Sequence, residues 1–121
     1  MKVLVTGTDG YIGIWLASIL KERGHDVTGL DIGYYRDGWL YDGPSADSTQ
    51  IRKDIRYISE DDLAGFDAVC HLAELSNDPL GQHNRENTFD INHCGSVELA
   101  KKCKNVGIDR FVYTSSCSVY G

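Results

Sequence analysis

The 121-residue sequence has few basic residues and no long hydrophobic run, and each lack excludes a class of function. Twelve lysines and arginines stand against eighteen aspartates and glutamates, which gives a net charge of −6. A surface that binds duplex nucleic acid needs a basic patch, so we predict no nucleic-acid partner. No apolar run approaches the roughly 20 residues that span a bilayer, and the start of the chain turns polar too soon for a signal peptide. We therefore predict no membrane association.

The four cysteines form no pattern typical of a metal site or a disulfide framework. None belongs to a Cys-x-x-Cys pair, and no histidine stands at a zinc-finger distance from a cysteine pair. Cys70 and Cys117 lie in apolar, strand-like runs. We expect buried free thiols, no metal and a reducing, cytoplasmic location, with metal or disulfide roles as the alternatives.

Five short apolar runs along the chain predict β-strands. Helical or loop segments separate them, and strands joined in this way form a parallel sheet with right-handed crossovers. We predict an α/β fold of the Rossmann type, a doubly wound parallel sheet of about five strands in the order 3-2-1-4-5. No repeat or interdomain linker is visible, so residues 1–121 are expected to form one domain. The expected strands are 2–6, 26–31, 50–55, 66–73 and 110–115.

Two segments carry the helical repeat of apolar residues, one ending at Gly24 and the other, 82–106, ending at Gly107. A short helix is expected after Ser59, a typical N-cap followed by acidic residues. The segment 33–49 is rich in glycine and aromatic residues and predicts a long loop. The residues expected to share one helix face are Ile12, Trp15, Leu16, Ile19 and Leu20 in the first helix, and Val97, Ala100 and Cys103 in the second.

The loop between the first strand and the first helix has a glycine at every third position. Gly7, Gly10 and Gly13 form G-x-x-G-x-x-G, a variant of the usual dinucleotide fingerprint G-x-G-x-x-G. One glycine permits a tight turn, one lets backbone N–H groups approach a pyrophosphate, and one lets the helix pack closely on the sheet. The positive end of the helix would then face the phosphates. A plain strand–turn–helix connection is the alternative.

An acidic residue ends the second strand about 20 residues beyond the glycines, where dinucleotide-binding folds carry a ribose-binding carboxylate. Asp31 can accept hydrogen bonds from both hydroxyls of the adenosine ribose, and its charge would repel a 2′-phosphate. The sequence therefore predicts NAD as the cofactor, in preference to NADP, CoA or FAD. Asp9 is the discordant feature, because a carboxylate near a pyrophosphate is repulsive unless its side chain points away.

Further motifs follow at the carboxyl ends of the later strands, where ligands bind in open α/β sheets. They are Asp54-Ile55-Arg56, His71-Leu72-Ala73, Asn92-x-x-Gly95 and Ser115-Ser116-Cys117-Ser118-Val119-Tyr120-Gly121. Together with the glycine loop and Asp31, these motifs resemble the extended short-chain dehydrogenase/reductases, and more narrowly their NAD-dependent nucleotide-sugar epimerase/dehydratase group. The resemblance spans all 121 residues, with the motifs in the family's order.

The resemblance implies a set of cofactor contacts. Asp54 and Ile55 would flank the adenine, whereas Leu72 and Ala73 would line the dinucleotide through their backbone atoms. A surface acid at the end of a strand is the alternative for Asp54. The full cofactor-binding set is Gly7, Gly10, Tyr11, Ile12, Gly13, Asp31, Asp54, Ile55, Leu72 and Ala73.

The resemblance also implies catalytic and substrate contacts. Ser116 matches the family's catalytic serine or threonine, and Ser118 would touch a nucleotide-sugar substrate. Asn92 would support the active-site geometry from the long helix, with an ordinary helical residue as the alternative. A polar turn is the alternative for the serines, and His71 is expected to be packed rather than catalytic.

The family's proton-transferring pair, a tyrosine followed four positions later by a lysine, is absent from the 121 residues. In the family this lysine and the nicotinamide ribose lower the pKa of the tyrosine, so that it acts as a base near neutral pH. The pair lies some tens of residues beyond the Val-Tyr-Gly motif in the family, and this sequence stops at Gly121. We expect the N-terminal fragment of an epimerase or dehydratase that passes hydride from a sugar carbon to NAD. This chain alone is expected to be inactive, and a non-catalytic dinucleotide-binding sensor is the alternative.

Self-association is expected because the last predicted strand ends one edge of the sheet, and its residues 110–114 carry apolar side chains with little charge. In the family the long helix commonly packs in a dimer interface. A homodimer or another mode of association is therefore predicted, and a monomer with a shielded edge is the alternative.

Overall fold

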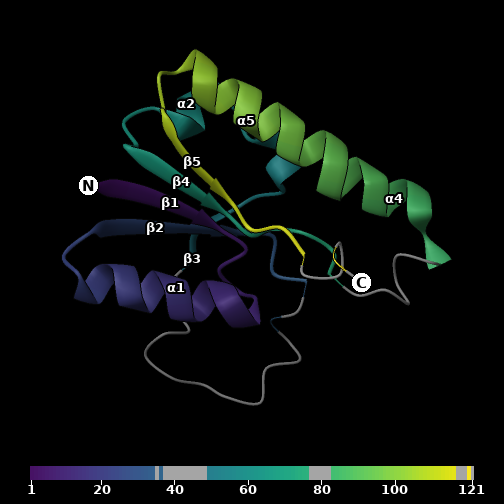
Figure 1. The fold of residues 1–121 in the computed structure, drawn as a ribbon, viewed down its shortest axis with the longest axis horizontal. Coiled ribbons are helices and arrows are strands. Elements are labelled where there is room, and N and C mark those ends of the chain that lie inside the picture. The colour runs from purple at the N-terminus through teal and green to yellow at the C-terminus, as the bar shows by residue number, and fades with distance from the viewer. Residues whose placement is uncertain (35, 37–48, 77–82, 117–119, 121) are drawn as a thin grey trace.

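A parallel sheet of five strands forms the centre of the structure, a computed structural model that describes residues 1–34, 36, 49–76, 83–116 and 120 (Figure 1). The strand order is β3-β2-β1-β4-β5 and every neighbouring pair is parallel, which confirms the predicted Rossmann-type topology. Most of the predicted loop 33–49 lies outside the described residues. The strands are β1 (Lys2–Thr6), β2 (Asp26–Asp31), β3 (Thr49–Arg52), β4 (Ala68–His71) and β5 (Arg110–Tyr113).

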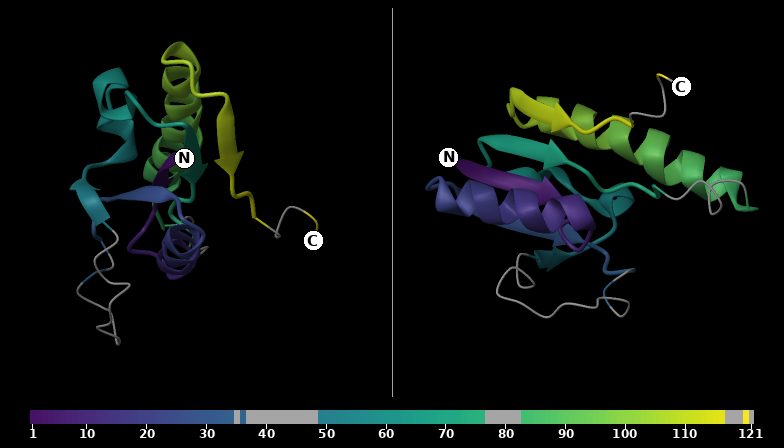
Figure 2. Two further views of the ribbon diagram at one scale, coloured as in Figure 1. Left: turned by 90° about the vertical axis from the view of Figure 1, so that its left-hand side faces the viewer. Right: turned by 60° about the horizontal axis from the view of Figure 1, so that its bottom comes forward.

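Helices cover both faces of the sheet, as right-handed crossovers require (Figure 2). Helix α1 (Tyr11–Glu22) lies on one face. The other face carries the short helices η3 (Ile55–Tyr57) and α2 (Glu60–Leu63) and a long helical rod. The rod consists of α4 (Arg85–Phe89), the π-helical segment η4 (Asp90–Gly95) and α5 (Ser96–Asn105), so the predicted long helix contains a wider turn near its middle.

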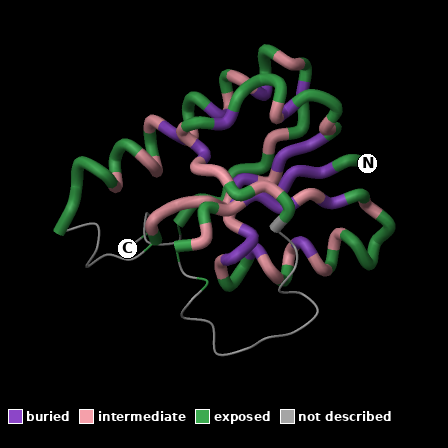
Figure 3. Tube along the Cα trace, turned by 180° about the vertical axis from the view of Figure 1, so that it is seen from behind, coloured by how far each residue is buried: buried purple, intermediate pink, exposed green. Residues whose placement is uncertain are grey.

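Alternate residues of β1 supply two hydrophobic layers, because successive side chains of a strand point to opposite faces. Val3 and Val5 belong to the layer under α1, together with Ala17. Leu4 belongs to the opposite layer, together with Leu99 of α5, and both are fully buried. Figure 3 shows the buried positions concentrated along the central strands. A strand covered on both faces has no polar alternation, which explains the uninterrupted apolar run of β1.

The apolar repeat locates α1 correctly and predicts its buried face only in part, because Leu16 and Leu20 pack against the hydrophobic layer but other members of the repeat do not. Gly13 and Ala17 are the buried residues of α1, whereas Trp15 is 62% and Ile12 58% exposed. Small side chains at these two positions let the helix axis approach the sheet. In the long helix Leu99 and Cys103 are buried, which confirms Cys103 of the predicted stripe, whereas Val97 is 40% exposed.

The third strand is shorter than predicted because a helix cap begins where it was expected to continue. It ends at Arg52, and the Asp54 carboxylate then accepts a hydrogen bond of 2.9 Å from the backbone N–H of Arg56, which caps η3. The expected N-cap at Ser59 is confirmed, since Ser59 and Asp62 form a reciprocal capping box. The fourth strand likewise ends at His71 rather than at residue 73.

Among the described residues, no helix is both long and apolar enough to span a bilayer. The three described cysteines, Cys70, Cys94 and Cys103, are free thiols, and Cys103 is buried. Burial raises the pKa of the Cys103 thiol to about 11, so it carries no charge at neutral pH.

Candidate functional site

A cavity of about 1240 Å³ lies at the carboxyl ends of the strands. Ser116 lines it from beyond β5, whereas Asn92 is outside the lining and Ser118 lies outside the described residues. The structure therefore brings together residues that the sequence spreads over more than 100 positions, although their binding roles stay predictions. All the cofactor-binding candidates line the cavity: Gly7, Gly10, Tyr11, Ile12, Gly13, Asp31, Asp54, Ile55, Leu72 and Ala73.

The glycine loop packs so closely that side chains have no room at two of its positions. A Cβ atom on Gly13 would stand 2.0 Å from the carbonyl oxygen of Gly7. A Cβ atom on Gly7 would stand 2.9 Å from the backbone nitrogen of Ala73, and Gly7 also has a φ of +78°. The loop thus brings the start of α1 directly to the cavity. Amides in the first turn of a helix lack intrahelical acceptors, so this turn can bind an anion.

Asp31 is fixed at the cavity wall by two backbone donors. Its carboxylate accepts hydrogen bonds from the N–H of Asp9 at 3.0 Å and from the N–H of Gly33 at 2.7 Å. Gly33 has a φ of +84°, a conformation that glycine adopts without strain. The oxygen atoms that sequence reasoning assigned to the ribose are therefore held in one orientation before any ligand binds.

The buried carboxylate of Asp9 forms an ion pair with Arg52 across the glycine loop and β3. The Asp9 side chain is only 2% exposed, whereas that of Arg52 is 40% exposed. The guanidinium compensates the charge that made Asp9 discordant beside a phosphate site. Sequence reasoning did not identify Arg52, because its partner is 43 positions away along the chain.

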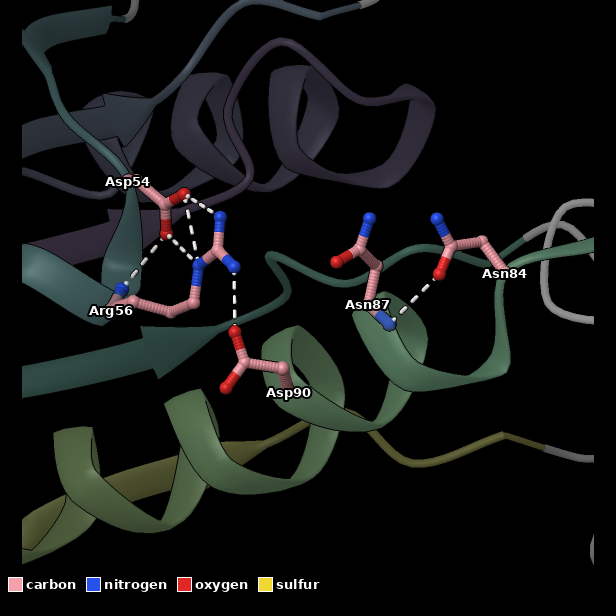
Figure 4. Close-up of polar contacts among 5 residues, drawn as sticks. All are labelled: Asp54, Arg56, Asn84, Asn87 and Asp90. Atoms are coloured by element: carbon pink, nitrogen blue, oxygen red, sulfur yellow. Dashed lines mark hydrogen bonds and ion pairs between the residues drawn. The ribbon is translucent and has the colours of Figure 1, made fainter.

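Asp54 is held by an arginine rather than left exposed at the end of a strand (Figure 4). Arg56 donates to its carboxylate through Nη2 at 2.6 Å, and also donates to Asp90 at 2.6 Å. Burial works against the charge of Asp54, yet the hydrogen bonds from Arg56 hold its pKa below the usual value. Arg56 thus connects Asp54, which is expected to lie beside the adenine, to Asp90 of the long helix.

A buried network of Thr6, His71 and Ser96 positions the backbone of Leu72 and Ala73. The Thr6 hydroxyl accepts from the N–H groups of Leu72 at 3.1 Å and Ala73 at 3.2 Å. Both acceptor sites of the hydroxyl are then used, so its proton is donated to Nδ1 of His71, 2.7 Å away. The other ring nitrogen, Nε2, carries the hydrogen and donates to Ser96 at 2.7 Å.

The histidine of this network is neutral at pH 7. His71 is fully buried, and burial lowers its pKa to about 4. A neutral ring with one acceptor and one donor nitrogen is what the two hydroxyl partners require. His71 is therefore packed in a polar network, as expected, and its lack of a catalytic role stays a prediction. No motif in the sequence pointed to Thr6 as its partner.

Asn92 acts on the cavity through the backbone of Leu75. Its side chain accepts from the Leu75 N–H at 2.9 Å and donates to the Leu75 carbonyl at 3.0 Å. Asn92 lies in η4, and a π-helical turn inside a longer helix is a frequent feature of functional sites. This contact holds the segment after β4, which lines the cavity, so it supports the predicted structural role of Asn92.

Tyr113 is the tyrosine at the end of β5, and its hydroxyl donates a hydrogen bond to Glu74. This bond to a carboxylate raises the pKa of Tyr113 to about 12. The phenol is therefore protonated at neutral pH and does not replace the missing basic tyrosine. Among the described residues, no group of histidine, cysteine, aspartate and glutamate is arranged to hold a metal ion.

A parallel sheet with a glycine loop before its first helix and a carboxylate at the end of its second strand defines a Rossmann-type dinucleotide-binding domain. The chain belongs to the NAD dependent epimerase/dehydratase family, whose model matches residues 3–121. This membership confirms the resemblance seen in the sequence, and NAD is the cofactor of the family.

Curated relatives agree with this membership. A UDP-glucose 4-epimerase of Corynebacterium glutamicum is 32% identical over all of this chain, which spans 36% of that protein. A UDP-glucose 4-epimerase of Klebsiella pneumoniae is 31% identical, and the chain covers 93% of it. The chain spans little more than a third of the first matched relatives, 36% and 37% of their lengths.

Solved structures show the same fold. An NAD dependent NDP-hexosamine 5,6-dehydratase of tunicamycin biosynthesis has a TM-score of 0.85 at 30% identity, over 99% of this chain and 38% of that one. A UDP-glucose-4-epimerase from Stenotrophomonas maltophila with bound NAD and formylated UDP-arabinopyranose has a TM-score of 0.81 at 30% identity. It matches 100% of this chain and 38% of its own.

The Thr6 network predicts a difference between two substitutions at one position. Thr6→Val keeps the side-chain shape but leaves the N–H groups of Leu72 and Ala73 without their acceptor. We expect it to lower the free energy of unfolding by roughly 2–4 kcal/mol. Thr6→Ser keeps the hydroxyl and should cost about 1 kcal/mol, the value of one buried methyl group. Urea unfolding followed by circular dichroism measures both, and equal losses would show that the hydroxyl is unimportant.

Proposed function

We propose that residues 1–121 form the NAD-binding domain of a nucleotide-sugar epimerase or dehydratase. The observation that carries this proposal is the single cavity in which the glycine loop, the start of α1 and Asp31 meet. Family membership and relatives crystallised with NAD and UDP-sugars support it. A cytoplasmic location stays a prediction from the cysteine pattern.

The described residues suit each part of a dinucleotide. The amides at the start of α1 would bind the pyrophosphate, where the close contact of Gly7 and Gly13 leaves the backbone uncovered. The anchored carboxylate of Asp31 would accept from the ribose hydroxyls. Asp54 and Ile55 would flank the adenine at the far side of the cavity.

The nicotinamide half would lie along the segment after β4 and near Ser116. Leu72 and Ala73, held by Thr6, would contact the dinucleotide through their backbone atoms. Bound NAD supplies the acceptor for a hydride from a sugar carbon. Ser116 would donate a hydrogen bond to the reacting hydroxyl or carbonyl of a nucleotide-sugar, with Ser118 as a second substrate contact.

NAD binding tests the proposal directly. We expect the 121-residue chain to bind NAD more tightly than NADP, as isothermal titration calorimetry would show. Asp31→Asn should weaken NAD binding about tenfold, because a charged acceptor of the ribose hydroxyls becomes neutral, and it should narrow the preference over NADP. Asp26→Asn, at the other end of β2, is the control and should leave both affinities unchanged. Equal binding of NAD and NADP by the unaltered chain would disprove the assignment of Asp31.

The chain by itself should not turn over nucleotide-sugars. It supplies Ser116 but no Tyr-x-x-x-Lys pair, and loss of a positioned acid–base group alone lowers rates on the order of 10²–10⁴-fold. Incubation of the NAD-loaded chain with UDP-glucose, followed by chromatography of the sugar, measures this. Efficient conversion would contradict the proposed division of roles.

A non-catalytic dinucleotide-binding sensor is the second candidate, and the absence of a Tyr-x-x-x-Lys pair from these 121 residues fits it as well as it fits a fragment of an enzyme. The gene distinguishes the candidates. A reading frame that continues beyond Gly121 into such a pair within a few tens of residues identifies an enzyme, whereas a stop codon there favours the sensor.

We also propose that the chain self-associates. Strand β5 is an edge of the described sheet, and its residue Val112 is 58% exposed. Two surfaces are available, this edge and the long helix, where Phe89 is 60% exposed.

Sedimentation velocity should show concentration-dependent association. Val112→Lys should reduce it if edges pair, and Val97→Lys if helices pair, whereas a strict monomer at all concentrations would rule out both modes.

A further inference from the structure

Arg52 lies beside the carboxylate that marks the ribose site. It is the direct partner of Asp31 in the register between β2 and β3, and laterally paired residues point to the same face of a sheet. Its Nη1 atom stands 2.7 Å from the position that a Cβ atom of Gly33 would take. Gly33 in turn donates its N–H to Asp31. The Arg52 guanidinium thus lies beside the backbone that anchors Asp31, next to the expected place of a 2′-phosphate, although Arg52 is not among the residues that line the cavity.

Asp9 determines where that guanidinium points. Its carboxylate is almost completely buried in the glycine loop, and a buried charge requires a partner. Arg52 supplies the partner through Nη1. The backbone N–H of Asp9 meanwhile donates to Asp31. Asp9 therefore contacts both Asp31 and Arg52.

An arginine in this place would otherwise favour the phosphorylated cofactor. The guanidinium is the side-chain group best suited to bind a phosphate through two parallel hydrogen bonds. The Arg52 side chain is 40% exposed, so it has room to turn once its partner is removed.

We propose that Asp9 is a second determinant of cofactor specificity, which keeps Arg52 from binding a 2′-phosphate by holding it in an ion pair. This inference rests on the proposed binding of NAD at the cavity. Two effects would then act together. Asp31 repels the 2′-phosphate, and Asp9 holds in an ion pair the Arg52 guanidinium that could attract it. Because Asp31 remains, removing Asp9 should narrow the preference for NAD without reversing it.

Calorimetric titrations of NAD and NADP into four proteins test the proposal: the unaltered chain, Asp9→Asn, Arg52→Gln and the double variant. Asp9→Asn should lower the ratio of the NADP to the NAD dissociation constant at least about tenfold. The double variant should return the ratio to within about twofold of the unaltered value, because the gain depends on Arg52. Arg52→Gln alone should leave the ratio unchanged.

Several results would overturn the proposal. An unchanged ratio in Asp9→Asn would show that Asp9 has no effect on specificity. A gain in the affinity for NADP relative to NAD that persists in the double variant would show that loss of the Asp9 charge, rather than release of Arg52, is responsible. A selective loss of NADP affinity in Arg52→Gln would show that Arg52 already reaches the phosphate.

Folding of the variants is checked by circular dichroism. If a single variant does not fold, the double variant carries the test, because removing both members of an ion pair leaves no unpaired charge. A ratio near the unaltered value then supports the proposal, and a ratio lowered about fivefold or more overturns it. Failure of the unaltered chain to bind NAD would refute the proposed function itself, whereas NAD binding with an unchanged ratio in Asp9→Asn refutes only this inference.

Discussion

The contact between Gly7 and Gly13 is the constraint on which the rest of the site depends. With only 2.0 Å between a hypothetical Cβ on Gly13 and the Gly7 carbonyl oxygen, the first turn of α1 lies directly over the end of β1. The same closeness selects Ala17 for the buried face of the helix and leaves Trp15 outside. The residues that begin α1, Gly10 to Gly13, consequently line the cavity.

A second feature of the site is that acidic side chains near the cavity are held by specific hydrogen-bond donors. Asp9 pairs with Arg52, Asp54 with Arg56, and Asp31 with two backbone N–H groups. An acidic chain can therefore present an anion-binding loop, because the nearby carboxylates are compensated or turned aside. The segment after β4 is held in a similar way, by Thr6, which in turn is hydrogen-bonded to neutral His71 and through it to Ser96.

The sequence was sufficient for the topology, since apolar runs of strand length alternate with helical segments and glycine marks the phosphate loop. It also identified many of the residues that line the cavity, because these are adjacent to strand ends. It could not reveal the pairing of Asp9 with Arg52 or of Thr6 with His71, which join positions 43 and 65 residues apart. Nor could an apolar repeat show that Gly13 and Ala17 are the buried residues of α1, because it marks large residues and small ones approach the sheet there.

The central claim is that the start of α1 is the pyrophosphate site of a bound NAD. Backbone amide chemical shifts of ¹⁵N-labelled protein, recorded during titration with NAD, test it most directly. The account predicts saturable shifts at the amides of Gly10, Tyr11, Ile12 and Gly13, with further shifts at Gly33 beside the anchored Asp31. Saturable binding that leaves the glycine-loop amides unshifted would contradict it.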